Sequence, residues 1–311
     1  MPDTSFLTDP FDKITEDLRA SFRPQREWID KRGLCLATAF FLSGVGAGTW
    51  AASAYYDYGL GLVLSLLVVL VGSGGFHLAF LGKPQRFWRM LLRPQSSWIS
   101  RGIWGIAIFT PPAFLYMLPF YADGLPWGPD SALGKVFLGL SLFGALWLLV
   151  YKGFVLAVNK AVPFWNTPLL PPLYLAYGTR GGLALLFVAW AVLGEGAPEH
   201  ADLVKLWVVV SSGILVLFYL SGMYGANVTA QRSVMELLKG RASFAFYLGV
   251  VLLGLAAPIA LGALSLFFTT SMAYLGLIGA LSLVGDYYLT YSILKAGLYV
   301  PPMAESLAKR S

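Results

Sequence analysis

The sequence FHLAFLGKPQRFWRMLLRPQSSWISRG, residues 76–102, joins the end of one strongly apolar run to the start of the next. It is the most basic stretch of the chain, and its cationic side chains are Lys83, Arg86, Arg89, Arg93 and Arg101. A histidine, His77, lies about one helical turn inside the preceding apolar run. Long apolar runs joined by short basic connectors are typical of helices that cross a membrane. This stretch therefore predicts the fold class.

Composition supports an integral membrane protein. Of the 311 residues, 57% are hydrophobic and only 12% are charged, whereas about 25% of residues are charged in a typical soluble domain. The formal net charge of +6 would favour a nucleic-acid partner in a soluble protein. Here the basic residues gather between apolar runs, as orientation signals do in membrane proteins. We therefore expect the lipid bilayer as a partner, and no nucleic acid.

The number of spans follows from length, because a transmembrane helix needs about 20 mainly apolar residues. Eight stretches qualify, at residues 33–55, 59–81, 102–121, 133–158, 181–196, 203–228, 243–267 and 272–295. We predict an all-α membrane protein with two four-helix bundles, formed by residues 33–180 and 181–311. Residues 1–32 are polar without a signal-peptide core, and an amphipathic part from Phe11 to Trp28 suits the membrane interface. Four prolines predict a rigid, non-helical connector at 159–180.

Lysine and arginine are distributed unevenly between the connectors. Nearly all of them lie in the N-terminal segment, in residues 82–101, 159–180 and 229–242, and at the C-terminus. The loops on the other side carry acidic residues, namely Asp57, Asp123, Asp130, Glu195, Glu199 and Asp202. By the positive-inside rule, both termini face the cytoplasm in the inner membrane of the cell. The alternative is that the basic side serves to dock an acidic partner, and then the rule does not orient the chain.

The few metal-binding side chains predict that the chain holds no metal. Its single cysteine, Cys35, cannot hold an iron–sulfur cluster, which takes about four thiolates. Its two histidines, His77 and His200, fall on opposite sides of the membrane in the predicted topology and make a poor pair of haem ligands. We therefore expect no intrinsic cofactor, and we expect any cluster to belong to another subunit.

Polar residues from two segments converge on the basic side. The connector after His77 supplies arginines and hydroxyl groups, and the end of the fourth span supplies Tyr151. Tyrosine and histidine from adjacent spans can hydrogen-bond the two carbonyls of a quinone, while apolar side chains hold its tail. A histidine also suits the proton transfers that accompany quinone chemistry. The predicted quinone-binding residues are His77, Tyr151, Arg86, Ser100, Arg101 and Asn166.

A second polar group lies in the last spans. Asp286 falls about two-thirds of the way through the eighth span, where a charge is costly and marks a functional candidate. It could form a proton relay with Tyr224, Asn227 and Lys295, or it could simply be paired with Lys295 or with another helix. The same polar residues, together with the two-halved layout, support an alternative function as a proton or ion transporter.

Three motifs carry a family resemblance: HLAFLGKPQRFWRMLLRPQSSWISRG at 77–102, YKGFVLAVNKAVPFWNTPLLPPLYL at 151–175 and YSILKAGLYVPP at 291–302. Together they resemble the NrfD/PsrC family of eight-span, quinone-interacting membrane subunits of the polysulfide reductase type. The resemblance implies that His77 and Tyr151 line the quinone site. It also implies that the site is shaped, and the partner contacted, by Arg86, Arg101 and Asn166. A smaller residue than Lys152 commonly follows the tyrosine in this family.

The resemblance also implies the composition of a complex. Members of the family have no cofactor of their own and dock a ferredoxin-like iron–sulfur subunit, which serves a molybdopterin-type catalytic subunit with molybdenum or tungsten. The residues expected to dock that partner are Lys83, Arg89, Arg93 and Trp98. The expected function is to exchange electrons and protons between the quinone or menaquinone pool of a respiratory chain and this partner, without acting on the terminal substrate. A membrane anchor without quinone chemistry is the remaining alternative.

Overall fold

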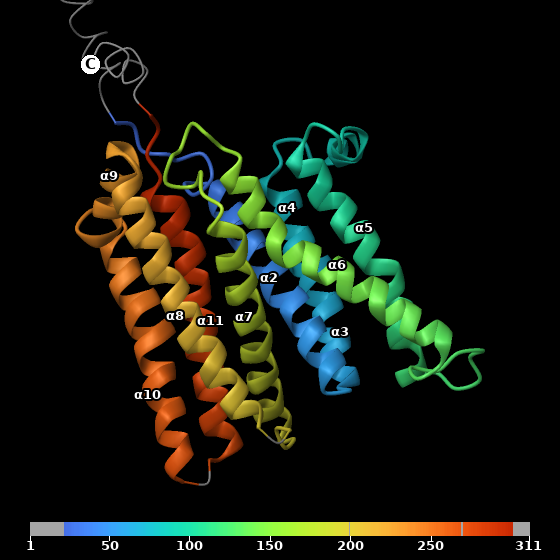
Figure 1. Cartoon of the computed structure of the whole chain (residues 1–311). Coiled ribbons are helices and arrows are strands. Elements are labelled where there is room, and N and C mark those ends of the chain that lie inside the picture. Colours follow the sequence, from blue (N-terminus) through green and yellow to red (C-terminus); the bar gives the residue numbers. More distant parts are fainter. Residues whose placement is uncertain (1–21, 199, 269, 301–311) are drawn as a thin grey trace, which may run out of the picture.

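The computed structural model describes residues 22–198, 200–268 and 270–300. Within these ranges the chain is helical apart from turns, connectors and one isolated bridge between Pro24 and Leu298. Eight helices in the described part are long and apolar enough to cross a membrane (Figure 1). The predicted all-α membrane fold is confirmed.

The first half of the chain contains four of these spans. They are α2 (Gly33–Tyr55), a continuous span made of α3 (Gly59–Leu67), the π-helical η1 (Val68–Ser73) and α4 (Gly74–Phe80), then α5 (Trp98–Met117) with the turn η3 (Leu118–Phe120), and α6 (Ala132–Ala157). A short 3-10 helix, η2 (Pro84–Leu92), lies in the basic connector before α5. The predicted spans 59–81, 102–121 and 133–158 therefore correspond to observed helices.

The second half repeats this arrangement with four more spans. They are α7 (Leu170–Leu193), α8 (Ala201–Ala226), a continuous span made of the π-helical η4 (Ala245–Ala256), α10 (Ala257–Leu264) and η5 (Ser265–Phe267), and α11 (Met272–Ala296). A shorter helix, α9 (Val228–Leu238), follows α8. The layout is consistent with two four-helix bundles.

The fifth span begins much earlier than the sequence predicted. Helix α7 starts at Leu170 rather than at residue 181, with Pro171 and Pro172 in its first turn. A proline there breaks no helical hydrogen bond, because the first N–H groups of a helix have no partner within it. The prediction of a non-helical connector over the whole of 159–180 was therefore wrong. Arg180 consequently lies inside the span.

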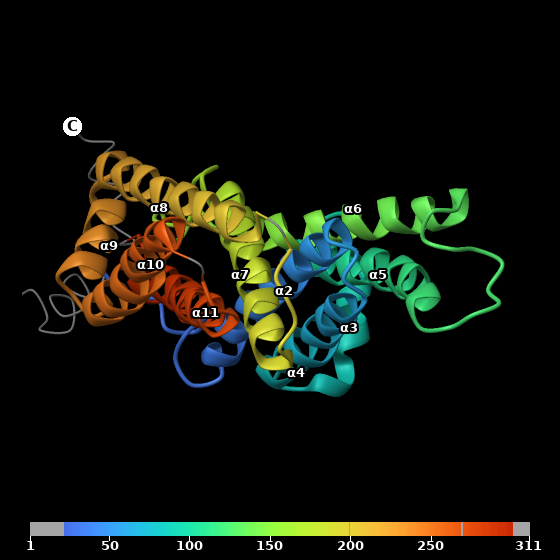
Figure 2. The same ribbon diagram turned by 90° about the horizontal axis from the view of Figure 1, so that it is seen from below.

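Helices α2 and α7 form the centre of the molecule. In an apolar stretch of 18 residues taken from each span, 67% of the residues are buried in α2 and 61% in α7, against 28–44% in the other six spans. Glycines let their backbones touch, since a Cβ on Gly182 would lie 2.6 Å from the Cα of Gly48. Figure 2 shows α7 between the group α2–α6 and the group α8–α11. The contact between α2 and α7 therefore joins the two halves.

The connectors define two faces of the molecule. The basic face, at the top of Figure 1, holds the connectors 81–97, 158–169 and 227–244 together with both described ends of the chain. There the backbone N–H of Gln25 donates to the carbonyl of Gly297 over 2.9 Å. The acidic face holds the described residues of the other connectors, at 56–58, 121–131, 194–198, 200, 268 and 270–271.

The N-terminal segment is fixed to the end of α11 on the basic face. Tyr299 donates from its hydroxyl to Glu27 over 2.9 Å. Burial and this contact together raise the pKa of Tyr299 to about 12. Most of the segment that we predicted along the membrane interface, Phe11 to Trp28, lies outside the described residues.

Candidate functional site

His77 lies in α4, one turn after the π-helical segment η1. Its Nδ1 is 2.9 Å from the carbonyl oxygen of Ser73, whose hydroxyl donates to the carbonyl of Ala39 in α2 over 2.9 Å. A carbonyl oxygen can only accept, so Nδ1 carries the proton and Nε2 keeps a lone pair. Short π-helical segments occur frequently at functional sites. Here the segment fixes the tautomer of His77 and leaves Nε2 as a proton acceptor.

Helix α4, which carries His77, lies at the surface of the described chain. His77 is half-buried, and none of the residues of α4 is buried. The neighbouring Phe76 is 41% exposed, and a Cβ on Gly75 would meet no atom within 4 Å. An apolar molecule dissolved in the bilayer can therefore approach this side of α4.

Tyr151 is buried between α5 and α6. Its phenol lies against the backbone of Gly102, where an added Cβ would be 2.6 Å from the Tyr151 oxygen. Only glycine leaves room for the ring at this position. The hydroxyl makes no hydrogen bond to any other residue of the described chain. The Tyr151 hydroxyl, which can both donate and accept a hydrogen bond, is thus available beside α5.

Lys152, the next residue, extends to the other side of α6. Its ammonium donates to the carbonyl of Phe40 over 2.9 Å, and it is 2% exposed. A Cβ on Gly44 would overlap this ammonium. The ring of Phe40 in α2 lies 6.1 Å from the His77 ring. His77 and Lys152 are therefore both in contact with Phe40, whereas Tyr151 packs on α5.

Arg101 holds the connector onto the start of α5. Its guanidinium donates to the carbonyls of Pro94 and Gln95, over 2.8 Å each, and lies 4.5 Å from the Trp98 ring. Its own carbonyl accepts from the indole of Trp147 in α6 over 3.0 Å. Arg101 and Trp98 therefore fix the backbone that packs on Tyr151. The binding role predicted for Arg101 and the docking role predicted for Trp98 stay predictions.

The other predicted residues fall into different surroundings. Ser100 is buried near the start of α5. Arg86 is exposed on η2, together with the predicted docking residue Arg89. Lys83, just before η2, and Arg93, just after it, are exposed as well. The structure therefore groups Arg86 with the docking residues rather than with Tyr151.

Asn166 belongs to the connector between α6 and α7. Its side-chain amide donates to the carbonyl of Ala157, at the end of α6, where helix carbonyls lack a partner. The preceding Trp165 donates from its indole to the carbonyl of Ile293 over 2.9 Å. This connector is thus hydrogen-bonded to α11 through Trp165. Asn166 provides a hydrogen-bond donor for a carbonyl at the end of α6.

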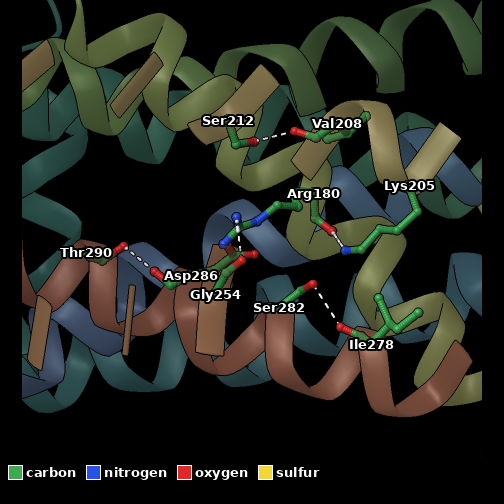
Figure 3. Close-up of polar contacts among 9 residues, drawn as sticks. All are labelled: Arg180, Lys205, Val208, Ser212, Gly254, Ile278, Ser282, Asp286 and Thr290. Carbon is green, nitrogen blue, oxygen red and sulfur yellow. Dashed lines mark hydrogen bonds and ion pairs between the residues drawn. The ribbon is translucent and has the colours of Figure 1, made fainter. Parts of the chain in front are cut away.

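The four residues predicted as a proton relay do not come together. Asp286 is buried in α11 and forms an ion pair with Arg180 of α7 (Figure 3). Lys295 instead pairs with Asp30 over 2.8 Å on the basic face. Tyr224 is 51% exposed, and Asn227 accepts a hydrogen bond at the start of α9. Of the two alternatives for Asp286, the structure shows a pairing with another helix.

Two buried cations beside Asp286 were missed in the sequence. Arg180 is 0% exposed and also donates to the carbonyl of Gly254 over 3.1 Å. Lys205 of α8 is 2% exposed and donates to the carbonyl of Arg180 over 2.9 Å (Figure 3). Lys205 could have been found as a charge inside a predicted span. Arg180 could have been found by starting α7 at its prolines.

Metal ligands do not gather in the part of the chain that the structure describes. No three His, Cys, Asp or Glu side chains among those residues form a group that could hold a metal ion. The absence of an intrinsic cofactor stays a prediction.

Comparison with known proteins identifies the family. The family model described as polysulphide reductase, NrfD, matches residues 33–302. One chain of the polysulfide reductase of Wolinella succinogenes is 25% identical over 293 residues, which cover 84% of the present sequence and 92% of that protein. Protein NrfD of Escherichia coli strain K12 is 28% identical over 285 residues, covering 84% and 87%. One subunit of the sulfite dehydrogenase of Allochromatium vinosum is 29% identical over 154 residues, or 46% of each protein. Because the family match extends over all eight spans, this multi-pass membrane protein belongs to the NrfD family.

Proposed function

We propose that this chain is the membrane subunit of a respiratory oxidoreductase complex, where it exchanges electrons and protons between the quinone pool and an iron–sulfur partner. The observation that carries the proposal is the presence of two polar groups without a partner in the described chain, Nε2 of the half-buried His77 and the hydroxyl of the buried Tyr151. Two relatives are named as parts of oxidoreductases, one of a polysulfide reductase and the other of a sulfite dehydrogenase. Their names support a corresponding role here.

The two side chains suit the proton steps of the reaction. Oxidation of a quinol to a quinone releases two electrons and two protons. Nε2 of His77 accepts the two quinol protons one after the other and releases each to water, while the hydroxyl of Tyr151 hydrogen-bonds the other quinol oxygen and orients the ring. The two electrons leave to the iron–sulfur cluster of the partner. Reduction of a quinone runs through the same contacts in reverse, with His77 as the proton donor.

The partner is proposed to dock on the basic face. The exposed segment η2 presents cations next to Phe87 and Trp88, which are 46% and 49% exposed. Charge complementarity therefore favours an acidic, ferredoxin-like subunit, itself joined to a molybdopterin-type catalytic subunit. The proposed contacts are Lys83, Arg86, Arg89 and Arg93. Trp98 stacks on Phe154 and supports this surface from below.

The test separates quinone chemistry from assembly. In the purified complex, we expect His77→Ala and Tyr151→Phe to lower quinone-linked turnover by about 10²-fold or more, while activity with an artificial dye and subunit composition persist. His200→Ala, in a connector on the acidic face, is the matched histidine control and should keep the quinone-linked rate. Unchanged quinone-linked rates in both site variants would refute the proposal and favour an anchor without quinone chemistry.

A second candidate function is supported by one observation. The buried charges around Arg180 and Asp286 are a feature of membrane proteins that move ions or protons. A transporter acting alone would move its ion without any quinone. An ion flux that persists in the isolated chain, with no copurified iron–sulfur subunit, would favour this function.

A further inference from the structure

An open groove of about 520 Å³ lies where the chain passes from α9 into the span that begins with η4. Its walls come from the end of α9 and from the first turns of that span: Leu238, Ser243, Phe244, Tyr247, Leu248 and Leu252. Ligand pockets in proteins usually have volumes of about 300–1,000 Å³ and mostly apolar walls. We call this hollow the η4 groove, and it is large enough for part of an amphipathic molecule.

One side of η4 is packed tightly on α11. A Cβ on Gly249 would overlap the Tyr288 ring, so this side has no room for a larger residue. Another side carries Phe244, Leu248 and Leu252, which are exposed and recur every four residues, about one helical turn. Short π-helical segments such as η4 occur frequently at functional sites. The helix is thus fixed on α11 and presents a continuous apolar strip to the η4 groove.

Two cations lie in the connector between α9 and η4, between the residues that line the groove. Lys239 and Arg241 are both exposed, and the Lys239 ammonium makes no ion pair or hydrogen bond within the described chain. Arg241 donates from Nε to Glu236 over 2.8 Å and from Nη2 to the carbonyl of Lys295 over 3.5 Å. A guanidinium has five N–H donors. Three of them therefore have no partner among the described residues and are available for an anion.

The η4 groove crosses the boundary between the basic face and the membrane. The connector with the two cations lies on the basic face, and η4 continues into the membrane span Ala245–Phe267 (Figure 1). Tyr247 is half exposed, and tyrosine is enriched where a protein crosses the membrane interface. The first N–H groups of the span have no partner within the helix and favour an anion nearby. Positive groups therefore lie at the depth of lipid headgroups, and the apolar strip lies at the depth of acyl chains.

We propose that the η4 groove is a binding site for an anionic phospholipid. The lipid phosphate accepts hydrogen bonds from Lys239 and from the free N–H groups of Arg241, as in other basic pockets beside membrane helices. One acyl chain lies along the strip of Phe244, Leu248 and Leu252. A zwitterionic lipid carries an ammonium of its own, which the two cations repel, so the site selects the anionic headgroup. The proposal does not depend on quinone chemistry.

Position and charge favour a lipid over the other occupants of such a groove. Figures 1 and 2 place α9 and α10 at one end of the molecule and α5 at the other. A partner docked on η2, in the connector before α5, therefore lies over the half of the chain away from the groove. The apolar strip belongs to a membrane span, which a water-soluble subunit does not reach. A quinone has a neutral headgroup and does not require two cations beside it.

The experiment measures lipid binding to the purified intact complex in detergent. The probes are dioleoyl phosphatidylglycerol and dioleoyl phosphatidylcholine, each with a photoactivatable diazirine in one acyl chain, and cross-linked peptides are identified by mass spectrometry. We expect phosphatidylglycerol to bind more tightly and to cross-link within residues 238–252. Lys239→Gln should raise its dissociation constant about fivefold, the contribution of one cation near a membrane surface, and leave phosphatidylcholine unaffected. Arg241→Gln, the second variant, should have at least as large an effect.

A matched control is available on the acidic face. Lys135 is exposed in the first turn of α6, so Lys135→Gln removes the same charge far from the groove and should leave both dissociation constants unchanged. Equal affinity for the two lipids, cross-links outside residues 238–252, or binding unaffected by both site variants would each overturn the proposal. Displacement of the lipid by millimolar glycerol 3-phosphate would replace it with a site for soluble phosphates. Cross-links seen in the isolated chain and absent from the complex would show that another subunit covers the groove, which also overturns it.

Discussion

The substitution Gly102→Ala tests the position of Tyr151 without removing any functional group. The new methyl would lie 2.6 Å from the Tyr151 oxygen, whereas ordinary contacts begin at 3.4 Å. Helix α5 cannot withdraw easily, because the carbonyl of Arg101 is hydrogen-bonded to Trp147 of α6. The tip of the phenol must therefore move by about 1 Å, and a misplacement of that size can lower a rate about 10²-fold. We expect a loss of that order in quinone-linked turnover.

Stability should change much less than the rate. Overpacking a core lowers the free energy of unfolding by about 1–3 kcal/mol. Replacing a helical glycine with alanine raises it by about 1 kcal/mol, which offsets part of the loss. The assay compares quinone-linked with dye-linked turnover of the purified complex and adds a thermal unfolding curve in detergent. Gly139→Ala in α6 is the control, because its methyl would meet no atom within 4 Å. A Gly102→Ala complex with the wild-type quinone-linked rate would show that the place of the Tyr151 hydroxyl is irrelevant to turnover.

Three further predictions concern stability and share one assay, thermal unfolding of the purified protein. Gly182→Ala places a methyl against the backbone of Gly48. Because α2 and α7 must then move apart, we expect the free energy of unfolding to fall by about 3 kcal/mol. An unchanged midpoint of thermal unfolding would contradict this packing. Arg180→Met should cost roughly 3–5 kcal/mol, and adding Asp286→Leu should recover part of it; a further additive loss would contradict that. Asp30→Asn breaks a partly exposed ion pair and should lower the free energy of unfolding by less than about 1 kcal/mol; a larger loss would contradict this.

The fold followed from the sequence because apolar length is nearly sufficient to identify a membrane span. In lipid the backbone N–H and C=O groups cannot hydrogen-bond to water, so they must bond to one another. An apolar run of about 20 residues satisfies this requirement by forming a helix. Helix ends are less certain where two signals compete. At 170–180 the prolines indicated a connector, and the apolar run that follows indicated a span. The structure shows that Pro171 and Pro172 begin the helix, which extended α7 toward the basic face.

The site was predictable only in part. His77 and Tyr151 were identified as polar groups at span ends and by family motifs, and their role stays a prediction. The requirement for glycine at 102 was not visible, since it depends on the position of a ring in another helix. Arg101 looked equivalent to Arg86 in the sequence, yet it holds the connector, whereas Arg86 is exposed.

The buried ion pair of Arg180 and Asp286 shows why hydropathy alone hides buried charges. A charge at membrane depth is unfavourable in isolation, so Arg180 was assigned to a connector and the predicted span began one residue later. Its cost is offset by Asp286, by the carbonyl of Gly254 and by the Tyr177 ring at 4.2 Å. Asp286 and Gly254 lie on other helices, 106 and 74 residues along the chain. A sequence can therefore reveal a candidate charge, but the groups that make its burial possible become visible only when the helices are packed.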